Sequence, residues 1–179
     1  MNTIKKEARS IFIFILIIIL MVVTMHFFVI PVHVDGNSMA NNIHNGDYML
    51  MNGHFKKEDL KRFDILVINS NQADEILIKR LIGLPGETIK FENDQLYING
   101  EYIDEKFLDI EFMEEQKKAL NSKLFTENFE VTLGDNEYFA MGDNRLSSSD
   151  SRVYGSFHLS EIRSRRGVVI FPLSHFKKV

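Results

Sequence analysis

A long apolar run near the N-terminus constrains this chain more than any other feature. The run extends from Ile11 to Ile30, and only Thr24 and His26 interrupt it. A helix needs about 20 apolar residues to cross about 30 Å of hydrocarbon, and this run just meets that length. The sequence therefore predicts a transmembrane helix over residues 11–30.

The flanks of the run predict its orientation and its fate. Three basic residues precede it, Lys5, Lys6 and Arg9, and basic flanks favour the cytoplasmic side. A cleavable signal peptide would have a shorter apolar core ending in small residues, whereas this run continues through bulky residues to Pro31. We expect an uncleaved anchor in the cell membrane, with residues 1–10 in the cytoplasm and residues 31–179 on the outer face.

Composition limits the chemistry that the remainder can perform. The chain has 179 residues and a net charge of -4, so one membrane segment and one globular domain fit, and nucleic acid is not the expected partner. There is no cysteine, which excludes disulfides, thiol nucleophiles and cysteine-bound metals. The lipid bilayer is the partner that the composition supports.

After Pro31 the sequence is typical of a mainly β, antiparallel domain. Clusters of apolar and β-branched residues alternate with Gly, Asn and Asp, and Asn93-Asp94 and Asn99-Gly100 are typical of turns. The predicted strands are Val32–Val34, Tyr48–Met51, Ile65–Ile68, Ile76–Ile82, Thr88–Glu92, Gln95–Ile98, Glu130–Val131, Glu137–Met141 and Gly167–Phe171.

One charged segment, residues 109–128, has helical propensity and is predicted to be a peripheral insertion. It contains charges of both signs and no long block of like charge. A solvated surface helix or a mobile loop is therefore favoured over a helix that binds a partner.

The six histidines do not predict a triad or a metal site. They stand on different short segments, for example His33, His44 and His54, and no ligand-spaced pair such as H-E-x-x-H occurs. The Gly36–Ala40 segment also lacks the second glycine of the G-x-S-x-G elbow, which argues against an α/β-hydrolase. We expect no metal and no cofactor.

A lysine is the alternative general base for a serine, provided that its amine is neutral. Neutrality requires burial, because desolvation lowers the pKa of an ammonium group. Lys79 is the candidate, since it lies in the strand-like run Ile76–Ile82 with apolar neighbours on both sides. For this residue alone, an edge-strand lysine that extends to water is the alternative.

Four local patterns, in this order along the chain, resemble the bacterial type I signal peptidase family. They are Gly36–Met39, Phe63–Val67, Ile78–Glu87 and Met141–Arg152, of which the last is the most distinctive. The resemblance extends from the apolar run to Pro172, and the short length without large insertions resembles Gram-positive members. It implies a serine endopeptidase that removes N-terminal signal peptides from exported preproteins.

The resemblance implies a role for individual residues. Ser38 would be the nucleophile, Lys79 the general base, and Ser148 would orient the lysine amine through a hydrogen bond. The Ser38 N–H would be one oxyanion donor, while Gly36 has no side chain to supply the second. A supporting salt-bridge network would comprise Arg80, Asp143, Asp150 and Arg152.

The resemblance also implies where a substrate binds. An extended peptide would lie beside the segment that precedes Ser38 and beside the lysine strand, through main-chain hydrogen bonds. Val34 and Ile78 match positions that line small apolar pockets, and Asp35 and Gly36 belong to the same segment. The expected substrate-binding residues are Val34, Asp35, Gly36 and Ile78.

One departure and two alternatives remain. Asn41-Asn42-Ile43 stands where the family usually has Pro-Thr-Leu, and because asparagine does not fix φ the sequence leaves the rigidity of the segment behind the nucleophile open. A self-cleaving Ser/Lys repressor-type protease shares the dyad, but it works in the cytoplasm and usually has a DNA-binding domain. A catalytically weak or inactive membrane-anchored homologue would act as a binding module and would not need Ser38 and Lys79 together.

Overall fold

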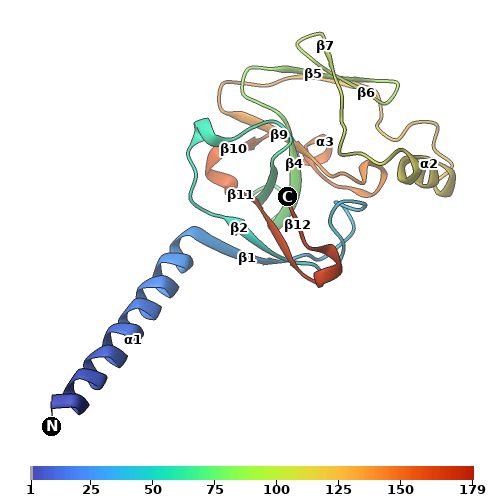
Figure 1. Ribbon diagram of the computed structural model, residues 1–179. Coiled ribbons are helices and arrows are strands. Elements are labelled where there is room, and N and C mark those ends of the chain that lie inside the picture. The colour runs from blue at the N-terminus through green and yellow to red at the C-terminus, as the bar shows by residue number, and fades with distance from the viewer. Residues whose placement is uncertain (1) are drawn as a thin grey trace.

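A long helix leads directly into a β domain (Figure 1). The computed structural model describes residues 2–179, and for residues 2–6, 8, 10 and 24–27 it describes the backbone alone. Helix α1 (Asn2–Phe28) projects away from the domain, and β1 (Val29–His33) follows without a break. Within the described residues, no helix is both long and apolar enough to cross a membrane.

The helix ends earlier than the apolar run does. The sequence predicts helix up to Ile30, whereas Val29 and Ile30 belong to β1 and pair with Asn52 and Met51. Both residues are β-branched and so suit a pleated strand. The prediction was therefore wrong for these two positions, where pairing with a neighbouring strand outweighs apolar continuity.

Two antiparallel sheets make up the β domain, as the sequence predicts. Within residues 2–179, the larger has eight strands in the order β1-β2-β11-β3-β4-β9-β10, with β12 paired to β11, and the smaller has the order β7-β6-β5-β8. The strands after β1 are β2 (Tyr48–Asn52), β3 (Ile65–Ser70), β4 (Glu75–Gly83), β5 (Thr88–Glu92), β6 (Gln95–Ile98), β7 (Glu101–Ile103), β8 (Phe129–Thr132), β9 (Glu137–Met141), β10 (Phe157–His158), β11 (Ile162–Phe171) and β12 (Lys177–Lys178).

The strands that the sequence missed are short or charged. β7, β10 and β12 have too few residues for an alternating pattern to be visible. β11 begins at Ile162, whereas the sequence predicts a start at Gly167. Arg165 and Arg166 interrupt the apolar pattern of its first half, and that half was therefore missed. Both arginines pair with Asp64. Pairing inside the fold makes charged residues compatible with a buried strand.

Strands β3 and β4 lie in the centre of the larger sheet, and both faces of β3 are covered. Leu66 and Ile68 pack into one apolar cluster, whereas Ile65 and Val67 pack into another on the opposite face. This alternation follows from the two-residue period of a strand. β4 pairs with β3 from Glu75 to Arg80 and with β9 from Arg80 onward, so Lys79 stands beside the fully paired part of the sheet.

The predicted turn and the predicted insertion both occur. Asn93 and Asp94 connect β5 to β6 with positive φ angles of 53° and 62°, which asparagine and aspartate tolerate. Within residues 109–128, helix α2 (Ile110–Ala119) buries none of its residues. Phe125 and Thr126 are buried, however, and both backbone N–H groups donate to Asp94 at 2.8 Å.

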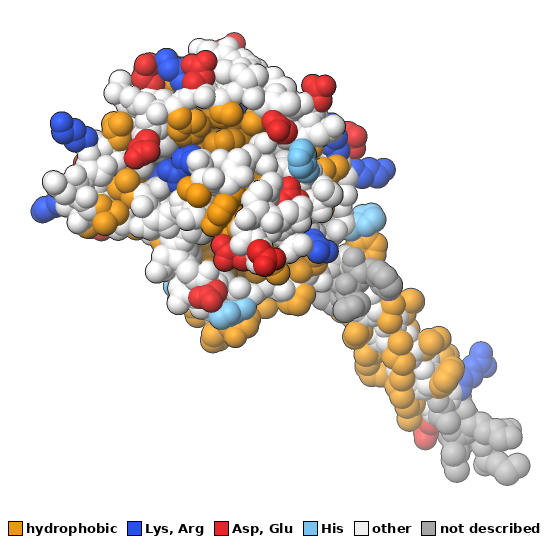
Figure 2. Space-filling view, turned by 180° about the vertical axis from the view of Figure 1, so that it is seen from behind, with side chains coloured by type: hydrophobic (Ala, Val, Ile, Leu, Met, Phe, Trp, Pro, Cys, Tyr) orange, Lys and Arg blue, Asp and Glu red, His pale blue; other side chains and the backbone are white. Residues whose placement is uncertain are grey.

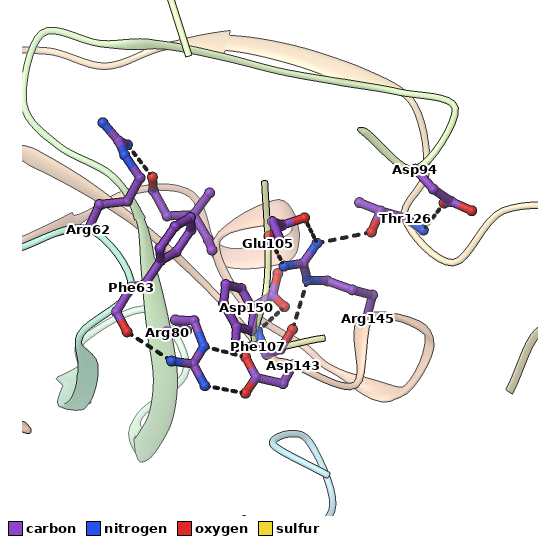
Figure 3. Close-up of polar contacts among 12 residues, drawn as sticks. Arg62, Phe63, Arg80, Asp94, Glu105, Phe107, Thr126, Asp143, Arg145 and Asp150 are labelled. Carbon is purple, nitrogen blue, oxygen red and sulfur yellow. Dashed lines mark hydrogen bonds and ion pairs between the residues drawn. The ribbon is translucent and has the colours of Figure 1, made fainter. Parts of the chain in front are cut away.

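A buried arginine connects the two sheets (Figure 3). Arg145 follows β9, its side chain is fully buried, and it forms an ion pair with Glu105 beyond β7. The same guanidinium donates to the Thr126 hydroxyl at 3.1 Å and lies over the Phe91 ring at 5.2 Å. Burial lowers the pKa of Arg145, but the charge and hydrogen bond of Glu105 outweigh burial and raise it, so the guanidinium stays charged.

Removing this guanidinium should destabilise the whole domain. Loss of one partner from a buried ion pair costs about 3–5 kcal/mol, because the other charge is left uncompensated. We therefore expect Arg145→Ala to lower the free energy of unfolding by that amount, measured by chemical denaturation. Lys90→Ala, which breaks an exposed pair with Glu92, is the control and should change it by less than about 1 kcal/mol. Equal losses in the two variants would contradict this role.

Candidate active site

The structure brings Ser38 and Lys79 together. Ser38 lies in the loop between β1 and β2, and Lys79 lies on β4. The lysine Nζ donates a hydrogen bond to Ser38 Oγ at 2.7 Å. Lys79 is only 3% exposed, so the alternative of a lysine side chain that extends to water was wrong.

Burial changes the protonation of the lysine. Desolvation lowers the pKa of Lys79 from its ordinary value of 10.5, and Arg152 lowers it further. The charges of Asp150, Glu75 and Asp143 act in the opposite direction without cancelling the effect of burial. The neutral amine is therefore reached at a lower pH than for an exposed lysine.

The serine loop is fixed by backbone contacts to the segment that follows β9. Asn144 N–H donates to the Ser38 carbonyl at 3.0 Å, and the Asn144 side chain donates to the Asn37 carbonyl at 3.3 Å. Gly142 permits this approach, because a Cβ there would overlap the Ser148 hydroxyl and the Ser38 carbonyl. The two segments are thus packed backbone against backbone at the serine.

Asn42 also anchors this loop, which the sequence did not predict. Its side-chain amide donates to the Phe107 carbonyl at 2.8 Å and to Asp143 Oδ2 at 2.9 Å. Asn41 makes a further bond, from Nδ2 to Asp109 Oδ2 at 3.2 Å. Side-chain hydrogen bonds therefore attach this segment to the fold at the position where a proline ring would otherwise fix φ.

Ser148 lies next to the site but bonds to a different residue from the one predicted. Its hydroxyl donates to Asp150 Oδ2 at 2.8 Å, and in the described part of the chain it has no hydrogen bond with Lys79. Asp150 is completely buried, and its carboxylate also accepts from the Gly142 N–H at 2.9 Å. An ionised carboxylate is a stronger acceptor than a neutral amine, which explains the choice.

The four residues of the predicted network form two ion pairs around the site. Arg80 binds Asp143 through two hydrogen bonds, at 2.8 Å and 2.6 Å, and lies under the Phe107 ring (Figure 3). Arg152 likewise binds Asp150 through two hydrogen bonds of 2.8 Å. Burial raises the pKa of Asp150, but the hydrogen bond and charge of Arg152 lower it more, so the net shift is downward.

The predicted substrate-binding residues line one groove. The groove has a volume of about 770 Å³ and reaches the Ser38–Lys79 pair. Its walls are the segment 30–39 on one side and residues 75–79 of β4 on the other, and Val34, Asp35, Gly36 and Ile78 are among them. β4 pairs with β9 only from Arg80 onward in the described ladder, so residues 75–79 have a free backbone edge on that side.

The histidines are less scattered than the sequence indicates. His44 and His175 both approach Asp47, and their rings pack against each other with centroids 4.6 Å apart. Sequence reasoning missed this contact because His175 lies 128 positions beyond Asp47. Elsewhere in the described chain, His33 contacts Tyr48, His54 contacts Phe28, and His158 contacts the Asn136 carbonyl.

Comparison with known proteins identifies the family. A family model described as signal peptidase, peptidase S26, matches residues 7–171. A signal peptidase I from Bacillus amyloliquefaciens is 36% identical over 92% of this chain and 88% of its own length, and one from Streptococcus pneumoniae is 31% identical over 97% and 98%.

A solved structure supports the same assignment. The crystal structure of a signal peptidase I from Enterococcus faecalis is 32% identical, with a TM-score of 0.51, and the match covers 60% of this chain and 96% of that one. Sequence and fold therefore agree over most of the molecule. The chain belongs to the signal peptidase family, peptidase S26, and is an enzyme of that family.

Proposed function

We propose that the chain is a membrane-anchored serine endopeptidase that removes N-terminal signal peptides from exported preproteins. Ser38 is the nucleophile and Lys79 the general base. The observation that carries the proposal is the 2.7 Å contact between a buried amine and a serine hydroxyl at the end of a groove. The signal peptidase I relatives support the choice of substrate.

The proposed reaction begins with a neutral Lys79. The Ser38 hydroxyl then donates to the amine, which takes its proton while Oγ attacks the carbonyl carbon of the scissile bond. The lysine gives this proton to the leaving amine, and the acyl-enzyme is hydrolysed by a water that the same amine activates. Among the described residues, none accepts a hydrogen bond from the Ser38 N–H, which leaves it free to stabilise the oxyanion.

The groove suits an extended peptide. The free edge of β4 at residues 75–79 offers main-chain donors and acceptors, so a substrate would add there as a strand. Val34 and Ile78 would contact small side chains next to the cut, with Asp35 and Gly36 on the same wall. The pairs Arg80–Asp143 and Asp150–Arg152 support the site from behind and take no part in proton transfer.

The proposed anchor is α1. Its described side chains from Ile11 to Val23 are apolar and exposed, as Figure 2 shows along the helix. Such a surface is costly in water and is stable in hydrocarbon. With the basic residues on its N-terminal side, this favours a cytoplasmic N-terminus and a catalytic domain outside the membrane.

Ser38→Ala should abolish cleavage while the fold is kept, because it removes the nucleophile and one oxygen only. We expect a loss of more than about 1000-fold in turnover of a preprotein, with the new N-terminus located by mass spectrometry. Ser160→Ala, on an exposed turn away from the groove, is the matched control and should retain full activity. Failure of the wild-type chain to cut any preprotein would favour the inactive binding module.

Lys79→Arg should be as inactive as Lys79→Ala, although charge and length are nearly kept. A guanidinium stays protonated and cannot accept the serine proton. Since burial lowers the pKa of Lys79, the wild-type rate should rise with pH by about tenfold per unit below that pKa and level off above it.

The pH profile of initial rates is the measurement, with Lys90→Arg as the control. Lys90 is exposed and lies on β5 in the smaller sheet, so its variant should keep the wild-type profile. Substantial turnover by Lys79→Arg, or a rate that is flat with pH, would show that Lys79 is not the base.

Removal of residues 2–28 should release the protein from membranes. The full chain should stay in the membrane pellet after alkaline carbonate extraction, because its apolar surface remains in lipid. The shortened chain keeps β1 intact, and it should be soluble and still able to cut a peptide substrate. Release of the full chain by carbonate would contradict anchoring through α1.

A further inference from the structure

A compact group of metal-ligating side chains lies away from the serine and the lysine. Asp47 is buried, 1% exposed, at the end of the serine loop, and it faces His175 in the turn η4 (Leu173–His175). His175 Nδ1 lies 2.7 Å from Asp47 Oδ1, and His44 Nδ1 lies 3.8 Å from Asp47 Oδ2. The three ligand atoms all lie within 4.8 Å of one another.

One of the three ligand atoms lacks a hydrogen-bond partner in the described chain, and the carboxylate between the loops is fixed in position. His44 Nδ1 is buried and has no hydrogen-bond partner among the described residues, which is costly for a ring nitrogen. The Asp47 carboxylate is held in place by the His44 backbone N–H, which donates to Oδ2 at 2.9 Å. A fixed carboxylate and an orphaned nitrogen at one point are the features of a preformed ligand set.

We propose that His44, Asp47 and His175 bind one divalent transition-metal ion, with Zn²⁺ the best match to the donors. Two imidazole nitrogens and one carboxylate oxygen form a common zinc ligand set that leaves a fourth position open. Bonds of about 2.0–2.2 Å to a tetrahedral ion place ligand atoms roughly 3.3–3.6 Å apart. The imidazoles are 43% and 35% exposed, so small ring rotations reach that spacing and water reaches the fourth position.

The donors select against other cations. Ca²⁺ and Mg²⁺ prefer an all-oxygen environment, which two imidazoles do not provide. The site differs from the catalytic pair, because proton transfer between Ser38 and Lys79 uses neither histidine. The inference is therefore independent of the proposed peptidase mechanism.

The ion would brace the wall of the groove. Val34 N–H donates to the Asp47 carbonyl and Gly46 N–H donates to the Val34 carbonyl, each at 2.9 Å. Gly36 N–H donates to Asn45 Oδ1 at 2.9 Å. The loop that carries two of the ligands thus holds the segment that leads to Ser38, and the metal would tie that loop to the turn after β11.

Zinc binding to the full, untagged chain in detergent tests the proposal. After chelator treatment, we expect calorimetry with ZnCl₂ to give one ion per chain with a Kd of about 1 µM or tighter. The melting temperature should rise by several degrees in excess zinc, because the ion binds the folded state alone.

Three matched substitutions assign the ligands. His44→Phe and His175→Phe keep an aromatic ring and remove the nitrogen, and each should weaken binding at least about tenfold and abolish the thermal shift. His158→Phe, at an exposed residue whose ring contacts the Asn136 carbonyl and which is not part of the cluster, should bind zinc as the wild type does. If a phenylalanine variant unfolds, His44→Asn and His175→Asn replace it.

Two results would overturn the site. One is the absence of one-to-one binding by the wild type, and the other is unchanged binding in both the His44 and His175 variants. Either result would mean that the group is a hydrogen-bonded ion pair that joins the C-terminal turn to the serine loop. Neither result would affect the assignment of Ser38 and Lys79.

Discussion

The hydrogen bond between Lys79 and Ser38 sets the requirements that the rest of the domain meets. An amine can accept a proton only when neutral, and burial lowers the pKa of Lys79, which favours the neutral form. Lys79 pairs with β3 on one side, while β9 joins β4 only from Arg80 onward and leaves residues 75–79 open toward the groove. Ser38 reaches the lysine from the loop between β1 and β2. Gly142 allows the Ser38 backbone to pack closely at this point, because it has no Cβ.

Arg80 and Arg152 pair with carboxylates that would otherwise favour the protonated form of Lys79. Asp150 and Asp143 lie near the lysine and raise its pKa, which opposes burial. Each carboxylate is bound by an arginine through two hydrogen bonds, and Arg152 itself lowers the lysine pKa. Asp150 accepts a hydrogen bond from Ser148, and Asp143 accepts one from Asn42. Because each carboxylate is paired with an arginine, its negative charge stabilises the protonated lysine less than an unpaired carboxylate would. Their contribution is to local electrostatics as much as to stability.

The parts of the fold that could be predicted are those encoded locally. The apolar residues around Lys79 predict strand β4. Asn93-Asp94 predicts the turn between β5 and β6, because both residues tolerate positive φ. Contacts between distant segments could not be predicted, since no local pattern encodes them. Asn42 forms a hydrogen bond with Asp143, which lies 101 residues away in the sequence. Arg145 forms an ion pair with Glu105, which follows the last-numbered strand of the β5–β7 hairpins. The bond from Ser148 to Asp150 depends on which neighbour is charged, and only the folded geometry decides that.

The position of the groove follows from chain continuity. Helix α1 ends at Phe28, and Ile30 and Pro31 already line the groove, so no linker separates the proposed anchor from the substrate site. With α1 in the bilayer, as proposed, the groove would lie at the membrane surface, where the end of a membrane-inserted signal peptide emerges. A peptide that leaves the bilayer beside α1 would meet the free edge of β4 first and the Ser38–Lys79 pair next. The proposed anchor would therefore select substrates by where they emerge, before any side-chain pocket is filled.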